Sequence, residues 1–347
     1  MSAPLSSATM KDIAQACGVS VVSVSRALRG DPNHAPDTRR RIQQMAEKMG
    51  YRPNPLVSAL MSERGRHKPG KSTVNLGLLH LAEGWESHDF HKGAIGQARS
   101  LGYSIERFPL EPGEAAARKL RRVLEFRGVR GVIVLPAPAA DWRMDFDFRG
   151  FAAATIGYSI VSPVLPRVVT DSFDRASEVL DLAARSGYRR VGWLSTFDDN
   201  VRLKNQYLAA AMVHQHVAKP QVQVFRLNLD SDTWSENNRK RLADWIQGRR
   251  IEAVITQLAG TEEALRRAGF RLPEDLAFVC LHRHEDPAIA CMDQMQETMG
   301  RKAADVVVGM INRNEFDLPR HPQTVIIPSL WRPGASFPTL RRPSPLG

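Results

Sequence analysis

The sequence predicts an all-α helix-turn-helix headpiece followed by an α/β core of two doubly wound lobes. Two patterns support this fold class. Between residues 9 and 49, three short segments place apolar residues at the spacing of an amphipathic helix. From residue 73 onward, apolar segments alternate with amphipathic ones, as in parallel sheets covered by helices. Two successive sets of this alternation indicate two lobes, and ligands of such sheets bind beyond the carboxyl ends of the strands.

The first predicted helix begins after Thr9, which can cap it, and Asp12 stands at the capping-box spacing. Gly18 ends this helix, and Ser20 can cap a second one after a short turn. The apolar stripe of the first helix consists of Met10, Ile13, Ala14 and Cys17. Two helices joined by so short a turn containing glycine are typical of a helix-turn-helix.

The second helix has two chemically different faces. At about 100° per residue, Val24, Ala27 and Leu28 share the side that packs inward. The other side carries Val21, Val22, Ser25, Arg26 and Arg29. Such a face suits a DNA major groove, because arginine can bond guanine twice, serine can reach a base or phosphate, and valine can contact a thymine methyl. An ordinary surface helix with two basic residues is the alternative.

A third helix is expected from Pro36, which suits a first helical position. Its apolar stripe is Ile42, Met45, Ala46 and Met49, and Gly50 ends it. Three arginines at positions 39 to 41 lie in its first turn, where they oppose the helix dipole. That cost is understandable if DNA phosphates compensate it.

A further short helix is expected after Asn54, which can cap it, with Pro55 at its first position. A helix of barely two turns is marginal in water and should form only against a partner. An apolar side chain such as Leu60, paired with its copy from a second subunit, could insert between base steps in a minor groove.

These segments together resemble the headpiece of the lactose-repressor (LacI/GalR) family of transcription regulators. The motifs are Thr9-x-x-Asp12-Ile13-Ala14, Gly18-Val19-Ser20, Val24-Ser25-Arg26-Ala27-Leu28, Thr38-Arg39 and Tyr51-x-Pro53-Asn54. The resemblance implies a DNA-binding headpiece, a hinge helix and an effector-binding core similar to type I periplasmic binding proteins. The departures from the family pattern are Cys17 and Ala35-Pro36.

The resemblance also implies roles in DNA binding. Val21, Val22 and Arg26 would read bases, and Leu60 would be the hinge wedge. The DNA backbone would be held by Ser20, Thr38 and Asn54. The remaining candidates for DNA contact are Thr9, Ser25, Arg29, Asn33 and Val57.

The charge distribution agrees with a nucleic-acid partner. The chain has a net charge of +11, and residues 1 to 71 contain twelve Lys or Arg against five Asp or Glu. Positive charge concentrated in a fifth of the chain favours DNA over a generally basic surface. No segment has the apolar length of a membrane span and no signal peptide is visible, so we expect a cytoplasmic protein. Three cysteines in apolar surroundings, Cys17, Cys280 and Cys291, are expected to be reduced and buried.

The elements of the core are expected in alternation. The expected strands are 74–80, 103–108, 129–135, 152–157, 168–171, 190–195, 222–227, 253–256, 276–281 and 323–327. The expected helices are 89–101, 112–127, 172–186, 201–217, 233–247, 261–268 and 295–312. The helix at 295–312 would return to the first lobe, and the strand at 323–327 would be followed by a final crossing. Such crossings form a hinge for lobe closure.

These expectations divide the chain into four parts. Residues 1–53 form the headpiece and 54–72 the hinge helix and linker. Residues 73–167 with 293–322 form the first lobe, and 168–292 with 323–347 the second lobe and tail. The family resemblance extends over the core more weakly, through landmarks such as Val168-x-x-Asp171, Ser186-Gly187-Tyr188-Arg189-Arg190-Val191 and Leu272-Pro273-Glu274-Asp275-Leu276.

Seven residues are candidates for contact with an effector between the lobes. Arg202 matches the family arginine that contacts the effector, although a surface ion pair would also explain it. Asp171 ends a strand at the appropriate edge. Trp85, His88 and Phe90 follow the first strand, where an aromatic ring can stack on a ligand or pack on its own lobe. His282 and Arg283 stand where the family commonly has two aspartates, which favours an anionic effector over a neutral sugar.

No metal or cofactor is expected. The residues Cys280, His282, His284 and Cys291 match no zinc spacing, and the chain has no phosphate-binding glycine loop and no nucleophile elbow. The sequence therefore predicts a non-enzymatic transcription regulator that acts as a repressor. It would bind a palindromic operator as a homodimer, or as a tetramer, and respond to a small-molecule effector. The alternative is a sugar-binding protein or sugar-modifying enzyme in which the core alone is functional.

Overall fold

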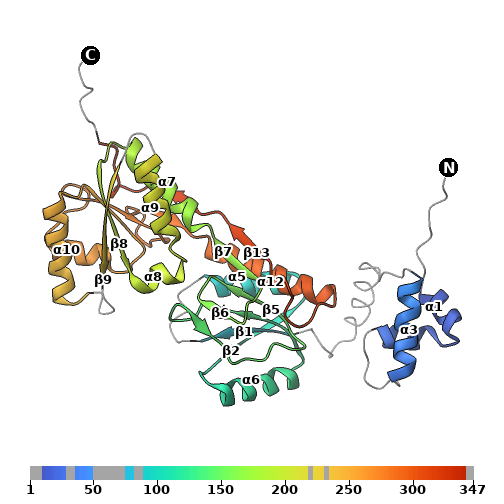
Figure 1. Ribbon diagram of the computed structural model, residues 1–347. Helices are drawn as coiled ribbons and strands as arrows, with labels where there is room; N and C mark the ends of the chain where they lie inside the picture. The colour runs from blue at the N-terminus through green and yellow to red at the C-terminus, as the bar shows by residue number, and fades with distance from the viewer. Residues whose placement is uncertain are drawn as a thin grey trace, which may run out of the picture. The chain divides into compact units, whose positions relative to one another are not determined.

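A computed structural model describes residues 10–28, 36–49, 75–81, 89–217, 222–229 and 234–340 (Figure 1). Within these ranges, the side chains of five headpiece residues lie outside the description: Lys11, Val22, Ser25, Arg26 and Pro36. The chain divides into two compact units, Met1–Lys71 and Ser72–Gly347. We describe each unit by itself.

The described part of the first unit contains the three expected helices: α1 (Met10–Cys17), α2 (Val21–Leu28) and α3 (Pro36–Lys48). Gly18 adopts φ +61°, a left-handed conformation that glycine accepts without steric cost, and this ends α1. The Ser20 Oγ accepts the backbone N–H of Ser23 at 3.1 Å, as expected of a cap for α2. The helices close a core of Ile13, Ala14, Cys17, Val24, Ala27, Ile42 and Ala46. The predicted trihelical unit is confirmed.

Arg41, which was expected to meet DNA phosphates, also makes a contact within the headpiece. Its Nη2 donates to the backbone carbonyl of Cys17 at 3.1 Å, at the last residue of α1. Carbonyls at a helix C-terminus lack partners within the helix, so this contact satisfies one of them and ties α3 to α1. Of the three arginines expected to meet phosphates, Arg41 therefore also stabilises the headpiece itself.

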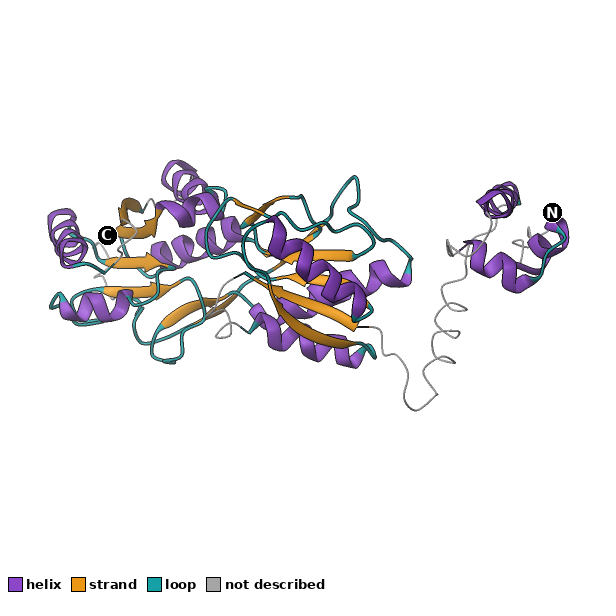
Figure 2. Cartoon of the chain, turned by 90° about the horizontal axis from the view of Figure 1, so that it is seen from below, coloured by secondary structure: helices purple, strands orange, loops and turns teal. Residues whose placement is uncertain are grey.

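The first lobe of the core is built on a six-stranded parallel sheet in the order β13-β7-β5-β3-β1-β2. Its strands are β1 (Asn75–His80), β2 (Ser104–Pro109), β3 (Val129–Val134), β5 (Ala152–Ile156), β7 (Arg167–Thr170) and β13 (Thr324–Ile327). Helices α5 (Phe90–Ser100) and α12 (Gln296–Asn312) share a buried cluster with one face of the sheet, and α6 (Glu114–Phe126) shares another with the opposite face. Figure 2 shows the resulting layers.

The second lobe repeats this plan in the order β14-β12-β11-β10-β8-β9, with only β14 antiparallel. Its strands are β8 (Arg190–Thr196), β9 (Gln223–Leu229), β10 (Ala253–Thr256), β11 (Ala277–Cys280), β12 (Ala290–Asp293) and β14 (Leu330–Arg332). Helices α7 (Ser172–Arg185) and α9 (Gln206–Val217) pack on one face, and α10 (Glu236–Arg249) and α11 (Thr261–Arg267) on the other. The predicted fold class is confirmed.

Two strands lie in the other lobe from the one expected. The boundaries set from the sequence placed residues 168–170 and 323–327 in the second lobe. In the structure β7 pairs with β5, and β13 pairs with β7, so both strands belong to the first sheet. Strand pairing decides sheet membership, and a run of buried residues does not reveal its pairing partners. The final crossing, expected after the strand at 323–327, does occur, because β14 returns to the second sheet.

Other local features differ from the sequence prediction. The single helix expected at 201–217 is two, α8 (Phe197–Arg202) and α9, separated by Lys204 and Asn205 at φ +52° and +57°. The strands not predicted are β12, β14 and a small pair formed by β4 (Trp142–Arg143) and β6 (Ile160–Ser162). Within the described ranges, no helix combines the length and apolar composition needed to cross a bilayer.

Candidate effector cleft and DNA-binding surface

The helix expected to enter the groove is described through its backbone and part of its side chains. Val24 and Ala27 are fully buried and Leu28 packs against the same core, whereas Val21 is 43% exposed. At about 100° per residue, positions 22 and 26 fall on the side of α2 opposite Val24. The inward face of α2 is therefore as predicted, and the assignment of Val22, Ser25 and Arg26 to base contacts stays a prediction.

The other DNA-contact candidates are placed as follows. Ser20 is exposed and its hydroxyl caps α2, and Thr38 is half-buried in the first turn of α3. The remaining candidates lie outside the described residues: Thr9, Arg29, Asn33, Asn54, Val57 and Leu60.

The core contains a cleft of about 1250 Å³ that residues of both lobes line. From the first lobe come the segment after β5 and the first turns of α5 and α12. From the second lobe come residues 282–285, which follow β11, and Gln257, which follows β10. This is the carboxyl edge of both parallel sheets, where the fold class predicts a ligand site.

Arg202, at the end of α8, bridges the two lobes. Its Nη1 donates to the carbonyl of Ala137 at 2.8 Å and its Nη2 to that of Pro138 at 2.6 Å, both in the segment after β3. Nη2 also pairs with Asp198 at 2.9 Å, and the other Asp198 oxygen accepts the backbone N–H of Ala140. Arg202 lines the cleft as expected, and its hydrogen bonds to Ala137 and Pro138 join the second lobe to the first.

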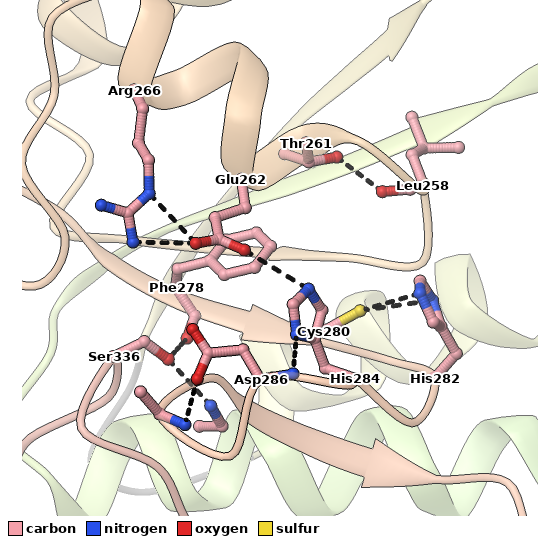
Figure 3. Close-up of polar contacts among 12 residues, drawn as sticks. Leu258, Thr261, Glu262, Arg266, Phe278, Cys280, His282, His284, Asp286 and Ser336 are labelled. Carbon is pink, nitrogen blue, oxygen red and sulfur yellow. Dashed lines mark hydrogen bonds and ion pairs between the residues drawn. The ribbon is translucent and has the colours of Figure 1, made fainter.

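His282 and Arg283 line the cleft after β11. The His282 Nδ1 lies 3.2 Å from the Cys280 sulfur (Figure 3). Burial raises the pKa of the Cys280 thiol to about 12, so this cysteine is a neutral thiol. Within the described part of the chain, no three His, Cys, Asp or Glu side chains are grouped as metal ligands.

His284 lies in the same loop but points to α11. Its Nε2 is 3.3 Å from the Glu262 carboxylate, and its Nδ1 accepts the backbone N–H of Asp286 (Figure 3). Glu262 also pairs with Arg266 at 2.8 Å. These contacts hold the loop that carries His282 and Arg283 against the second lobe.

The first-lobe wall contains Phe90, which is 6% exposed and packs into its own lobe while lining the cleft. Trp85 and His88 lie outside the described residues. Beside Phe90, the Asp89 carboxylate pairs with Lys92 at 2.7 Å, and this bond lowers the pKa of Asp89. The negative charge of this wall is therefore already balanced.

Asp171 is not brought to the cleft. Its Oδ1 accepts the backbone N–H of Asp174 at 2.9 Å, so it caps α7, and the cleft is lined by its neighbours Thr170 and Ser172 instead. The sequence reasoning also missed a cleft residue, Arg175, which is 2% exposed. Its signal was available, because Arg175 stands four residues before Val179 in the buried stripe of α7, where a charge is unusual.

Two family models match the chain. The model for bacterial regulatory proteins of the lacI family matches residues 9–54, and the model for a periplasmic binding protein-like domain matches residues 180–337. The two matches follow the order headpiece and then core.

Two named regulators align with nearly the whole chain, and a third aligns with a short stretch of it. The HTH-type transcriptional regulator RegA of Clostridium saccharobutylicum is 21% identical over 323 residues, 90% of this chain and 95% of RegA. The HTH-type transcriptional repressor PurR of Vibrio vulnificus is 20% identical over 92% of this chain and 97% of PurR. Catabolite control protein A of Priestia megaterium is 39% identical over 56 residues, 16% of this chain and 17% of that protein.

Solved structures show the same fold. A CelR–cellobiose complex superimposes with a TM-score of 0.57 at 18% identity, covering 95% of this chain and 99% of that one. A lac repressor dimer bound to operator and the anti-inducer ONPF gives 0.53 at 17% identity, covering 96% and 100%.

These relatives are named regulators, so a sugar-modifying enzyme or a separate binding protein is not favoured. The chain thus has a LacI-family helix-turn-helix domain followed by a periplasmic-binding-protein-like domain, and its homologues are LacI/GalR-type DNA-binding transcriptional regulators.

Proposed function

We propose that this regulator is a repressor whose operator affinity is set by a small molecule bound between the core lobes. The observation that carries this proposal is the interlobe cleft, which is lined by both lobes and bridged by Arg202. A ligand that changes the Arg202 bridge changes the relative stability of lobe arrangements. Differential affinity for two arrangements is the means by which an effector shifts an equilibrium.

The headpiece reads a palindromic operator as part of a homodimer, or of a tetramer. The similar lac repressor structure is that of a dimer bound to operator, which supports this assembly by analogy. Two-fold symmetry in the protein corresponds to two half-sites in the DNA, with one α2 in each major groove.

The effector carries negative charge. Three carboxylates that line the cleft are already paired with cations: Asp89 with Lys92, Asp293 with Arg332, and Glu297 with Arg301. His282 and Arg283 stand where the family commonly has two aspartates, so those two negative charges are missing and Arg283 adds a positive one. Six Lys or Arg side chains line the cleft against five Asp or Glu, and because three of those carboxylates are already paired, the cleft favours an anion over a neutral sugar.

The groove assignment is tested with Arg26→Ala. A side chain that bonds a guanine twice contributes about 1–3 kcal/mol to discrimination between bases. In a gel-shift assay with DNA from upstream of the gene, we expect the variant to bind its preferred site about 10- to 100-fold more weakly and to lose preference at one base pair of each half-site. The matched control is Arg118→Ala, which removes an exposed ion pair on α6, in the first lobe.

Salt dependence tests the contribution of phosphates in the same assay. The affinity of the wild type should fall steeply as salt rises, with a slope set by the number of phosphates neutralised. Unchanged base preference in Arg26→Ala, or an affinity insensitive to salt, would reject the assignment of α2 to a major groove.

A further inference from the structure

Arg175 is a buried cation at the wall of the effector cleft. It lies in the first turn of α7, is 2% exposed, and lines the cleft together with Ser172 and Asp199. The guanidinium carbon is 5.2 Å from the centre of the Tyr207 ring, which comes from α9. The site is therefore formed by two helices of the second lobe.

The guanidinium is only partly satisfied. Its Nη2 donates to the Ser172 hydroxyl at 3.3 Å and to the Tyr207 hydroxyl. Its Nε and Nη1 are buried and have no acceptor among the described residues. Since Nε carries one hydrogen and Nη1 two, three of the five N–H donors of Arg175 are unmatched. Buried polar groups in native proteins are nearly always paired, so this shortage needs an explanation.

The neighbouring groups do not supply the missing negative charge. Burial raises the pKa of Tyr207 to about 12, so this phenol is neutral, and the Cys280 thiol is neutral for the same reason. The Asp199 carboxylate, which also lines the cleft, accepts the backbone N–H and the hydroxyl of Thr196. Within the described part of the chain, Arg175 forms no salt bridge with a carboxylate.

Three other arginines that line the cleft do have a carboxylate partner. Arg202 pairs with Asp198, Arg301 with Glu297 and Arg332 with Asp293. A single buried charge without a counter-ion is costly, and a native protein tolerates it when a ligand provides the counter-ion. One guanidinium balances one negative charge, which fits a carboxylate better than a phosphate dianion.

We propose that Arg175 binds the carboxylate of the effector through Nε and Nη1, with Ser172 and Tyr207 fixing the guanidinium from the other side. The inference rests on the proposed effector cleft and specifies its ligand class: a small metabolite with one carboxylate, such as a sugar acid. Arg175 thereby selects acids against neutral sugars of the same shape, because a neutral ligand would leave its buried N–H groups unpaired.

Calorimetry on the full-length protein tests this selection. The probes are two pairs of sugars, glucose with glucuronate and galactose with galacturonate. Within each pair, the neutral sugar has a hydroxymethyl group where the acid has a carboxylate. Glucose 6-phosphate separates a carboxylate from a phosphate. We expect the wild type to bind at least one acid about tenfold or more tightly than its neutral partner, as a charge-assisted pair implies, and to prefer it to the phosphate.

Variants then assign that preference to Arg175. Arg175→Met should reduce the affinity for the acid to that for the neutral sugar, and Arg175→Lys should give an intermediate affinity. Arg185→Met, an exposed position on the same helix, is the matched control and should change nothing. Without ligand, Arg175→Met should melt at or above the wild-type temperature, because a buried charge without a counter-ion has been removed. A purely structural arginine would lower the melting temperature when replaced.

Three outcomes would overturn the inference: acid affinity unchanged in Arg175→Met, a preference for glucose 6-phosphate, or no acid bound by the wild type. Operator binding by the same proteins is measured in parallel. If neutral sugars alone change operator affinity, the assignment of Arg175 fails and the regulator with an interlobe effector remains. If no cleft ligand changes operator affinity, the proposed function fails as well.

Discussion

The headpiece and the core use positive charge in opposite ways. In the headpiece, Arg40 and Arg41 are exposed on a small helical unit. In the core, Arg175 is buried and Arg202 is held by carbonyls of the facing lobe. Exposed cations contribute additively to binding a polyanion, and salt weakens this binding. A buried cation pairs with a single negative charge, and salt screens that interaction much less. As proposed above, one chain would combine a salt-sensitive phosphate-binding surface with a site selective for one small anion.

The two regions also differ in how much burial supports them. Seven buried residues make up the headpiece core, whereas four larger clusters support the two lobes. Small cores leave small stability margins. Changes in the headpiece core should therefore abolish DNA binding while leaving the cleft intact, and the following experiments test that separation.

The largest expected effect is that of Val24→Asp. Val24 is fully buried between the three helices, so an aspartate there places an unpaired charge in a core with little margin. We expect operator binding to fall below detection in a gel shift. The affinity of the core for its ligand, measured by calorimetry, should stay within about twofold of the wild-type value. A change of about 1.4 kcal/mol in binding free energy would alter it tenfold.

The control for Val24→Asp is Val123→Asp, at a position of α6 that is 37% exposed. This variant should keep both activities. Loss of ligand binding in Val24→Asp would show that the two units do not fold independently, against the separation seen in their internal contacts.

A smaller effect is expected for Arg41→Ala. Removing the contact between Arg41 and the Cys17 carbonyl should destabilise the headpiece by about 0.5–1.5 kcal/mol, the usual range for one hydrogen bond. Amide hydrogen exchange in α1 and α3 of the full-length protein measures this loss, and exchange in the core should not change. Arg40→Ala, at the preceding exposed position, is the control, and equal acceleration in both variants would contradict the assigned role.

The smallest effect concerns acid stability of the second lobe. Burial lowers the pKa of His214 below its ordinary value of 6.5, and Asp181 only partly opposes this shift. The unfolded chain therefore binds a proton more readily, so the stabilisation is present above about pH 6.5 and is lost as the pH falls through that value toward the folded pKa. His214→Gln should flatten the decline in melting temperature between pH 7.5 and 5.5.

His216→Gln is the matched control on the same helix, since His216 is exposed. It should leave the pH dependence of the melting temperature unchanged. Headpiece unfolding, followed by hydrogen exchange in α1, should be insensitive to His214→Gln, which again separates the two regions.

Within the described residues of the headpiece, the three helices and their buried faces could be predicted from the sequence. Helix ends follow from local chemistry, such as Gly18 in a left-handed conformation and Ser20 as a cap, and the buried face of α2 follows from helical period alone. Arg41 was the exception, because its carbonyl partner lies 24 residues away in the sequence.

The cleft could be predicted only in outline. Its position follows from the strand–helix alternation, and Arg202, His282 and Arg283 do line it. Asp171 does not, since the same carboxylate that ends a strand can also cap the next helix, and here it caps α7. Arg175 was overlooked because its importance depends on what its guanidinium lacks, and that is visible only when all its neighbours are in place.

The sequence by itself determined the three helices and the α/β class, because periodicity, caps and turn residues act within a few positions of one another. Only the tertiary structure decided which sheet received β7 and β13, that Arg202 bridges the lobes, and that Arg175 is buried with unmatched donors. Pairing, bridging and burial each depend on residues far apart in the chain, and the free energy of such contacts is set by the three-dimensional neighbourhood.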